Sequence, residues 1–91
     1  MSIKWSLRAA SDLEALVAYI MEDDRATAEQ IAAKILRAVE QLADFPGLGR
    51  PGRVQGTREL TIAGLPYVVV YQAESRRVAI LRVLHARMQW P

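Results

Sequence analysis

The spacing of apolar residues predicts two helices in the first half of the chain. The first follows a short segment at residues 2–5 that is compatible with a strand. Ser6 is its predicted N-cap, because a serine hydroxyl accepts a hydrogen bond from a first-turn amide. Its apolar positions recur at i, i+3, i+4 and i+7, which places on one face Leu13, Leu16, Val17 and Ile20. Acidic residues 22–24 close this helix, and Asp24 is the predicted N-cap of the next one.

The second predicted helix is rich in alanine and runs to Phe45. Its apolar residues recur every three or four positions: Ile31, Ile35, Leu36, Val39 and Leu42. Pro46 ends it, because proline lacks an amide proton and disfavours the helical conformation in the residue before it. Since only a few polar residues separate the two helices, the pattern predicts an antiparallel hairpin whose apolar faces belong to the core.

A loop and then strand patterns fill the second half. Residues 46–56 contain four of the five glycines and two of the four prolines. This composition predicts a loop of about a dozen residues, long enough to suggest a function. The segments 58–62, 67–72 and 78–85 are β-branched and aromatic, and short turns between them predict a three-stranded antiparallel meander. The whole pattern predicts one two-layer α+β domain spanning residues 1–91, in the order β-α-α-β-β-β.

Alternation along the last strand divides its side chains between two faces. Val78, Ile80, Arg82 and Leu84 are predicted on one face, and Ala79, Leu81, Val83 and His85 on the other. Tyr67 and Tyr71 share a face of the preceding strand, where core packing is predicted for both. Both faces of these two strands are largely apolar. One face packs on the helices, and we expect the other to be covered too, with a partner as one candidate.

Composition excludes several classes of protein. With 52% hydrophobic and 24% charged residues, the chain has the profile of a folded protein. It has no cysteine and a single histidine, His85, so we expect no disulfide, no thiol nucleophile, no metal site and no cofactor. No apolar run approaches the length of a membrane span, and no secretory signal is apparent, so the expected location is the cytoplasm.

The net charge of +2 hides an uneven distribution. Residues 1–45 carry five basic and eight acidic side chains, a net charge of −3, whereas residues 46–91 carry seven arginines and two glutamates, a net charge of +5. Guanidinium groups match phosphate and carboxylate groups well. An anion-binding surface is therefore predicted from Arg50, Arg53, Arg58, Arg82 and Arg87. Trp90 is compatible with stacking on a partner or with packing back on the domain.

A series of short motifs extends over nearly the whole chain. In order, these are Trp5-Ser6 with Ala9, Asp12-Leu13, Tyr19-Ile20, Phe45-Pro46, Gly49-Arg50-Pro51-Gly52, Gly56-Thr57-Arg58-Glu59-Leu60, Pro66-Tyr67, Val70-Tyr71, Ile80-Leu81-Arg82-Val83-Leu84-His85 and Arg87. In order and spacing the chain resembles the RelE/ParE superfamily of bacterial toxins. The resemblance implies an antiparallel sheet with two helices packed on it. It also implies a toxin of a type II toxin–antitoxin system, of the kind associated with plasmid stabilisation, which a cognate antitoxin wraps and silences.

The residues also distinguish two branches of this superfamily. RelE-like members cleave mRNA on the ribosome, and they carry lysines where this chain has Glu59 and Thr61, and an arginine where it has Val68. They also carry a tyrosine or histidine near the end, where this chain has Trp90 and Pro91. RNA cleavage needs cations that hold the phosphate and its transition-state charge, and a carboxylate would repel it. The chain is therefore more similar to the ParE-like branch, whose activity is inhibition of DNA gyrase without catalysis.

The resemblance thus implies a ParE-like toxin that binds DNA gyrase. A cognate antitoxin would neutralise it in a hetero-oligomer, and operator DNA would be reached only through that complex. Contact with target or antitoxin is assigned to Arg50, Arg53, Arg58, Arg82, Arg87 and Trp90. Two alternatives remain open. One is a RelE-like ribosome-dependent mRNA endoribonuclease, with His85, Arg87 and Arg58 as candidate catalytic residues, and the other is a non-toxic module that binds an antitoxin.

Overall fold

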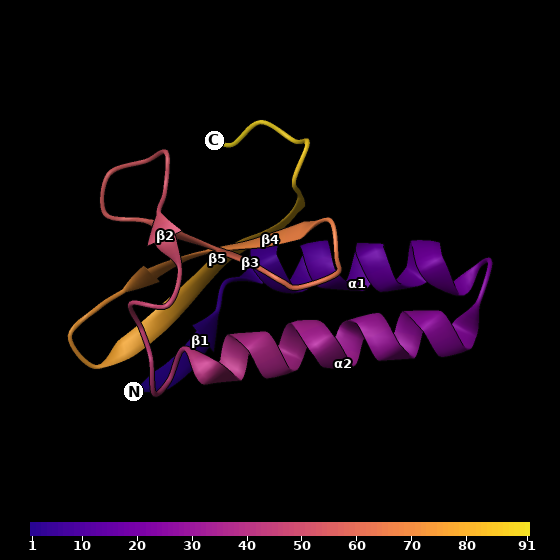
Figure 1. Cartoon of the computed structure of the whole chain (residues 1–91), viewed down its shortest axis with the longest axis horizontal. Helices are drawn as coiled ribbons and strands as arrows, with labels where there is room; N and C mark the ends of the chain where they lie inside the picture. Colours follow the sequence, from indigo (N-terminus) through magenta and orange to yellow (C-terminus); the bar gives the residue numbers. More distant parts are fainter.

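The protein has two layers, a five-stranded sheet and a helix hairpin that packs on one face of it (Figure 1). This computed structural model describes residues 1–91. Its elements are β1 (Ser2–Trp5), α1 (Leu7–Met21), α2 (Arg25–Gln41), β2 (Arg50–Pro51), β3 (Arg58–Thr61), β4 (Tyr67–Ala73) and β5 (Arg77–His85). The strands lie in the order β1-β5-β4-β3-β2. No helix combines the length and the apolar character needed to cross a membrane.

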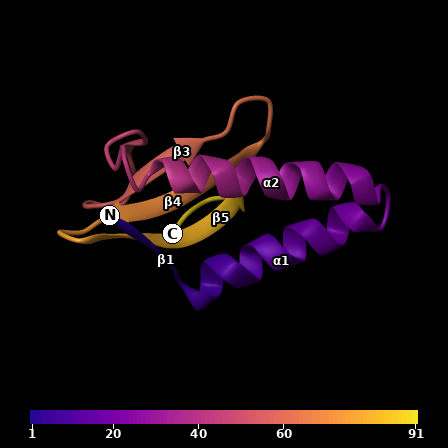
Figure 2. The same cartoon turned by 90° about the horizontal axis from the view of Figure 1, so that it is seen from below.

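The predicted helix caps and meander are confirmed. Oγ of Ser6 accepts a hydrogen bond from the amide of Ala9 at 2.9 Å, and Oδ1 of Asp24 accepts one from the amide of Thr27 at 3.1 Å. Figure 2 shows α1 and α2 side by side against the sheet. Strands β3, β4 and β5 pair antiparallel in sequence order. The predicted two-layer architecture is therefore confirmed.

Strand β1 makes the sheet mixed, whereas the resemblance implied an antiparallel sheet. It pairs in parallel with the first half of β5, from Ser2 opposite Arg77 to Trp5 opposite Ile80. Parallel pairing requires a long connection, and here all the other elements lie between the two strands in the chain. Local patterns carry no signal for a pairing at such a distance, so the direction of β1 could not be predicted.

Helix α2 ends at Gln41, before the predicted end at Phe45. The amides of residues 42–44 donate to carbonyls three residues back, at 3.0–3.2 Å. This tightened last turn satisfies backbone groups that the helix leaves free. It also brings the carbonyl of Pro46 within 2.8 Å of the hydroxyl of Tyr71, which donates to it. The helix thus ends early because the chain turns toward the sheet before the proline.

The predicted loop at residues 46–56 contains the short strand β2. Arg50 pairs with Glu59, and Pro51 pairs with Arg58, in antiparallel register. Proline is compatible with this position because β2 is an edge strand. The chain returns to β3 through Gly56, whose φ of +86° lies in the left-handed region that favours glycine. The predicted loop is therefore present, and it contains a two-residue strand that was not predicted.

A β-bulge in β5 changes the predicted assignment of its side chains. The register with β4 shifts after Ile80, which leaves Leu81 as the extra residue. Val83 consequently joins Ile80 in the core beneath the helices, whereas Leu81 and Leu84 pack on the opposite face. The prediction placed Val78, Ile80, Arg82 and Leu84 on one face and Ala79, Leu81, Val83 and His85 on the other. Beyond Ile80 this grouping is wrong.

The main core lies between the helices and the sheet. Tyr71 is its largest fully buried side chain, followed by Ile35, Leu42, Ile80, Val39, Val69 and Val78. Tyr67, Leu13 and Leu16 pack against this core while partly buried, as predicted. Leu36 is 44% exposed, because α2 turns its Ile35 and Val39 edge inward instead. The prediction of Leu36 in the apolar stripe was wrong.

Candidate functional site

The sheet face opposite the helices, called the far face below, carries a second apolar cluster. Val68, Val70 and Leu84 are buried there, and Leu81 and Trp90 pack against them. Trp90 belongs to residues 86–91, called the C-terminal segment, which Figure 1 shows on the side of the sheet away from α2. The chain itself therefore covers part of the second apolar face, and Trp90 packs back on the domain.

A pocket of about 80 Å³ opens on the far face next to the C-terminal segment. Its lining includes four residues predicted as functional, which are Arg50, Arg53, His85 and Trp90. It also includes Glu59, Thr61 and Val68, the strand positions that the resemblance singled out. The other lining residues are Val70, Leu84, Ala86 and Met88. The fold thus brings together residues that lie far apart in the sequence, so this pocket is the candidate site.

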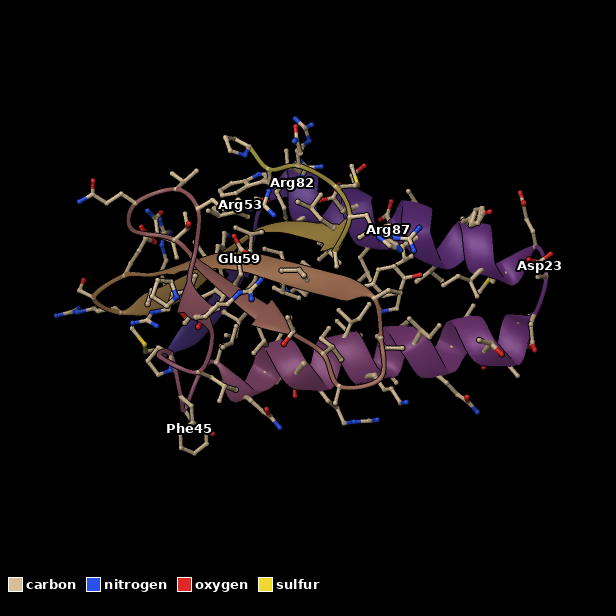
Figure 3. The ribbon with its side chains drawn as sticks, turned by 45° about the horizontal axis from the view of Figure 1, so that its top comes forward. Asp23, Phe45, Arg53, Glu59, Arg82 and Arg87 are labelled. Carbon is tan, nitrogen blue, oxygen red and sulfur yellow. The ribbon has the colours of Figure 1, made fainter.

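Glu59 organises the basic side of the pocket. Its side chain is only 10% exposed, and Oε1 lies 3.5 Å from Nη2 of Arg50 on the neighbouring strand. Oε2 accepts a hydrogen bond from the backbone amide of Arg53 at 3.2 Å. Figure 3 shows Glu59 and Arg53 on the same side of the sheet. Glu59 therefore fixes the loop and offsets part of the charge of Arg50, while the guanidinium of Arg53 has no acidic partner.

Arg58 and Tyr71 hold the glycine-rich loop against the sheet. Nη1 of Arg58 donates to the carbonyl of Gly49 at 2.7 Å and to that of Gly47 at 3.5 Å. The hydroxyl of Tyr71 accepts from the amide of Gly49 and donates to the carbonyl of Pro46, both at 2.8 Å. Arg58 does not line the pocket, and part of its hydrogen-bonding capacity is used within the fold. A partner contact by Arg58 stays a prediction.

Arg82 is paired inside the protein. Its Nε and Nη2 donate to the two carboxylate oxygens of Asp12 in α1, at 2.7 and 3.1 Å. Oδ2 of Asp12 also accepts from the backbone amide of Val83 at 3.0 Å, beyond the part of β5 that pairs with β1. The hydroxyl of Ser6 donates to the carbonyl of Leu81 at 3.1 Å on the same strand. Arg82 therefore helps to join α1 to β5, and its contact with a partner stays a prediction.

Asp12 had not been assigned this role from the sequence. It lies beside Leu13 of the apolar stripe, at the border of the buried face of α1. A carboxylate at such a border needs a hydrogen-bonding partner. Asp12 also belongs to one of the motifs that carry the resemblance, but neither signal could identify Arg82 as its partner, because the two residues are 70 positions apart.

The Asp12–Arg82 pair should make stability depend on pH. Partial burial would raise the pKa of Asp12, but hydrogen bonds from Arg82 and Val83, with the charges of Arg82 and Arg8, together hold the pKa below its ordinary value of 3.8. The unfolded state therefore binds this proton more tightly, so the stabilisation is present above pH 3.8 and is lost as the pH falls through the lowered pKa. We expect the difference in unfolding free energy between wild type and Asp12→Asn, measured by urea titration, to shrink between about pH 5 and about pH 2. A difference independent of pH would contradict this expectation.

His85 and Arg87 are adjacent at the end of β5. Nδ1 of His85 accepts a hydrogen bond from the backbone amide of Arg87 at 3.1 Å, so the neutral ring carries its proton on Nε2. The ring lies edge-on to Tyr67, with centroids 5.9 Å apart. The side chain of Arg87 is exposed and makes no ion pair. The contact joins the His85 ring to the backbone of Arg87, and only His85 lines the pocket.

The lining of the pocket suits binding better than cleavage of a phosphodiester. Its two guanidinium groups, those of Arg50 and Arg53, lie on one side of the pocket, and Glu59 contacts both residues. The carboxylate would repel a scissile phosphate, and the indole of Trp90 exchanges no proton near neutral pH. No group of three or more His, Cys, Asp or Glu side chains is arranged to hold a metal ion. What the pocket offers is an apolar surface bordered by positive charge.

Comparison with known proteins gives consistent matches over the whole domain. The family model described as ParE toxin of type II toxin-antitoxin system, parDE, matches residues 3–90. The chain is 48% identical over 89 residues to the putative toxin Y4kP of Sinorhizobium fredii, covering 98% of this chain and 92% of that protein. It is 33% identical over 84 residues to the toxin RelE2 of Caulobacter vibrioides, covering 92% and 93% of the two chains.

Two solved structures share the fold. A chain of the chromosomal ParDE toxin–antitoxin system of P. aeruginosa superposes with a TM-score of 0.82 at 31% identity, covering 93% of this chain and 95% of that one. A chain of the toxin–antitoxin complex RelBE2 of Mycobacterium tuberculosis superposes with a TM-score of 0.70 at 23% identity, covering 92% and 95%. The second likeness concerns the fold alone.

Proposed function

The chain belongs to the ParE family of toxins of type II toxin–antitoxin systems, and on this premise we propose that it arrests growth by binding DNA gyrase, without catalysis, and that a cognate antitoxin neutralises it. The antitoxin is the better supported partner, because the family model describes a toxin of a type II toxin–antitoxin system and the similar structure at 31% identity comes from a ParDE toxin–antitoxin system. Operator DNA would be bound only through the antitoxin complex. A gyrase inhibitor acts in the cytoplasm, which is the compartment that the proposal requires.

One observation carries the choice of gyrase over RNA. Glu59, Val68 and Trp90 line one pocket, at positions where a RelE-like nuclease has cations and a proton-exchanging group. Glu59 is only 8% exposed and already engages Arg50, so it is a fixed negative charge at the place where a phosphate would bind. This combination supports a protein-binding toxin.

The RNA-cleaving alternative rests on two observations. One of the similar proteins is named RelE2, and His85 lies beside the exposed Arg87, where an imidazole and a guanidinium could serve acid–base chemistry and charge stabilisation. In this alternative Arg58 would be the second cation, although its Nη1 donates to loop carbonyls.

Induction without the antitoxin should separate the two functions. We expect growth arrest with filamentation and a DNA-damage response, and we expect the purified protein to inhibit supercoiling by purified gyrase. His85→Ala should retain nearly full inhibition, because a binder needs no proton transfer from the imidazole. Arrest of protein synthesis within minutes at normal DNA supercoiling, with activity abolished in a folded His85→Ala variant, would instead establish the nuclease. Harmless induction of the folded protein would identify a non-toxic antitoxin-binding module.

A further inference from the structure

Two arginines of the second half, Arg50 and Arg53, line the far-face pocket. Other arginines of that half have partners within the protein, namely Arg77 with Glu74, Arg82 with Asp12 and Arg58 with loop carbonyls. Arg53 lines the pocket and Arg87 lies between the lining residues Ala86 and Met88, and neither has an acidic partner. The side chain of Arg50 is 67% exposed despite its contact with Glu59. Arg50 and Arg53, which line the pocket, and the exposed Arg87, which adjoins the lining residues Ala86 and Met88 in the chain, are together called the arginine rim.

The apolar floor inside the arginine rim is covered by a loosely held part of the chain. The floor consists of Val68, Val70 and Leu84, and Trp90 packs on it. In the C-terminal segment, the amide of Met88 donates to the carbonyl of His85 at 2.9 Å, and residues 89–91 make no hydrogen bond. Residues held mainly by one side chain, without hydrogen bonds, open at a small cost in free energy. Trp90 therefore covers the floor without hydrogen bonds that would hold its own segment in place.

On the basis of the proposed function, we infer that the arginine rim and this floor form the surface that contacts the target. The ligand is an acidic segment of a protein that places one bulky apolar side chain on the floor, where Trp90 now packs. Complementary charge gives specificity and speeds association, and a buried apolar anchor supplies much of the affinity. A nucleic acid fits less well, because the floor offers aliphatic side chains, not an aromatic surface on which bases stack.

Charge reversal on the arginine rim tests the surface. The variant Arg53→Glu/Arg87→Glu is compared with Arg37→Glu/Arg76→Glu, which makes the same change in net charge at two exposed arginines that also lack ion pairs and lie outside the pocket. We expect the rim variant to abolish growth arrest and to weaken binding to purified gyrase by at least about tenfold, because like charges would then meet across the interface. The control variant should stay within about threefold of wild type. Urea unfolding verifies that both variants fold.

Removing Trp90 tests whether the ligand displaces the Trp90 side chain from the floor and binds there. If Trp90 competes with the ligand, Trp90→Ala should bind gyrase as tightly as wild type or a few-fold more tightly, because no cover has to open first. In a Trp5→Phe background, Trp90 is the only tryptophan, and its fluorescence should become more accessible to acrylamide when the target binds. A loss of about tenfold in affinity in Trp90→Ala, or fluorescence that becomes protected from acrylamide on binding, would show that Trp90 itself contacts the target. Either result would overturn the inference that the ligand displaces Trp90.

The outcomes separate this surface from the choice of gyrase. If wild type arrests growth without binding gyrase, the gyrase proposal fails, while loss of arrest in the rim variant still supports the surface. If the rim variant arrests growth like wild type, this surface does not bind the target, even when wild type binds gyrase. If that variant has also lost antitoxin binding, the surface belongs to the antitoxin interface. Cleavage of mRNA by wild type that the rim variant loses would assign it to RNA and overturn the acidic protein ligand. Absence of toxicity in wild type overturns both proposals.

Discussion

Asp12→Ala is expected to lower the free energy of unfolding by about 3 kcal/mol, at the lower end of the cost of breaking a buried ion pair. The pair is well shielded, with the side chains of Arg82 and Asp12 only 18% and 16% exposed. Removal of the carboxylate leaves the Arg82 guanidinium without its counter-ion and removes the acceptor of the Val83 amide. Unfolding in urea at neutral pH measures the effect, and for a domain of this size the melting temperature should fall by more than about 10 °C.

Glu14→Ala is the matched control for this loss. Glu14 is an exposed acidic residue of α1, two positions from Asp12, and it makes no ion pair. Its replacement should change stability by no more than about 0.5 kcal/mol, as is usual at surface positions. A loss below about 1 kcal/mol in Asp12→Ala would mean that the pair, despite its geometry, adds little to the stability of the fold.

Gly49→Ala is expected to cost about 2 kcal/mol, within the range found for overpacked sites. An added Cβ would lie 2.8 Å from both Cε1 and the hydroxyl oxygen of Tyr71, and 2.9 Å from the backbone carbonyl oxygen of Glu59. Tyr71 is fully buried and cannot swing aside. The clash would also disturb the hydrogen bond from the Gly49 amide to the Tyr71 hydroxyl. The measurement is the midpoint of urea unfolding relative to wild type.

The same loop supplies the control for this substitution. Gly47 has no atom within 4 Å of the position of an added Cβ, and its φ lies outside the left-handed region. Gly47→Ala should therefore leave stability within about 0.5 kcal/mol of wild type or raise it slightly, since alanine reduces the freedom of the unfolded chain. Equal losses at Gly47 and Gly49 would show that loop flexibility, and not the contact with Tyr71, sets the cost.

The features predicted correctly depend on residues that are close in the sequence. The Ser6 and Asp24 caps each involve an amide three positions away, and the meander follows from short turns between β-branched segments. The errors involve distant partners. The short β2 forms only because β3 lies next to it, and the bulge at Leu81 is defined by the register with β4. The end of α2 likewise depends on Tyr71, 25 positions beyond Pro46.

The candidate site was predicted in part. The charge difference between the two halves identified the basic side of the molecule, but not which arginines remain free there. That depends on contacts such as Arg82 with Asp12 and Arg58 with Gly49, which only the folded chain defines. The resemblance to a toxin superfamily singled out Glu59, Val68 and Trp90 as the residues that differ from a nuclease. The structure brings these three into one pocket, a proximity that no local pattern contains.

The parallel pairing of β1 with β5 bears on how the protein is made. Ser2 to Trp5 leave the ribosome first, yet their pairing partners, Arg77 to Ile80, are synthesised only after every other element of the sheet except the rest of β5. Contacts between such distant segments form slowly, because a long loop must close before they are gained. The hydrogen bonds to the carboxylate of Asp12 also cannot form before β5 is synthesised, because their donors, Arg82 and Val83, lie on that strand. A nascent chain therefore cannot complete its sheet until β5 emerges from the ribosome. The folded toxin consequently forms only after the last strand has been synthesised.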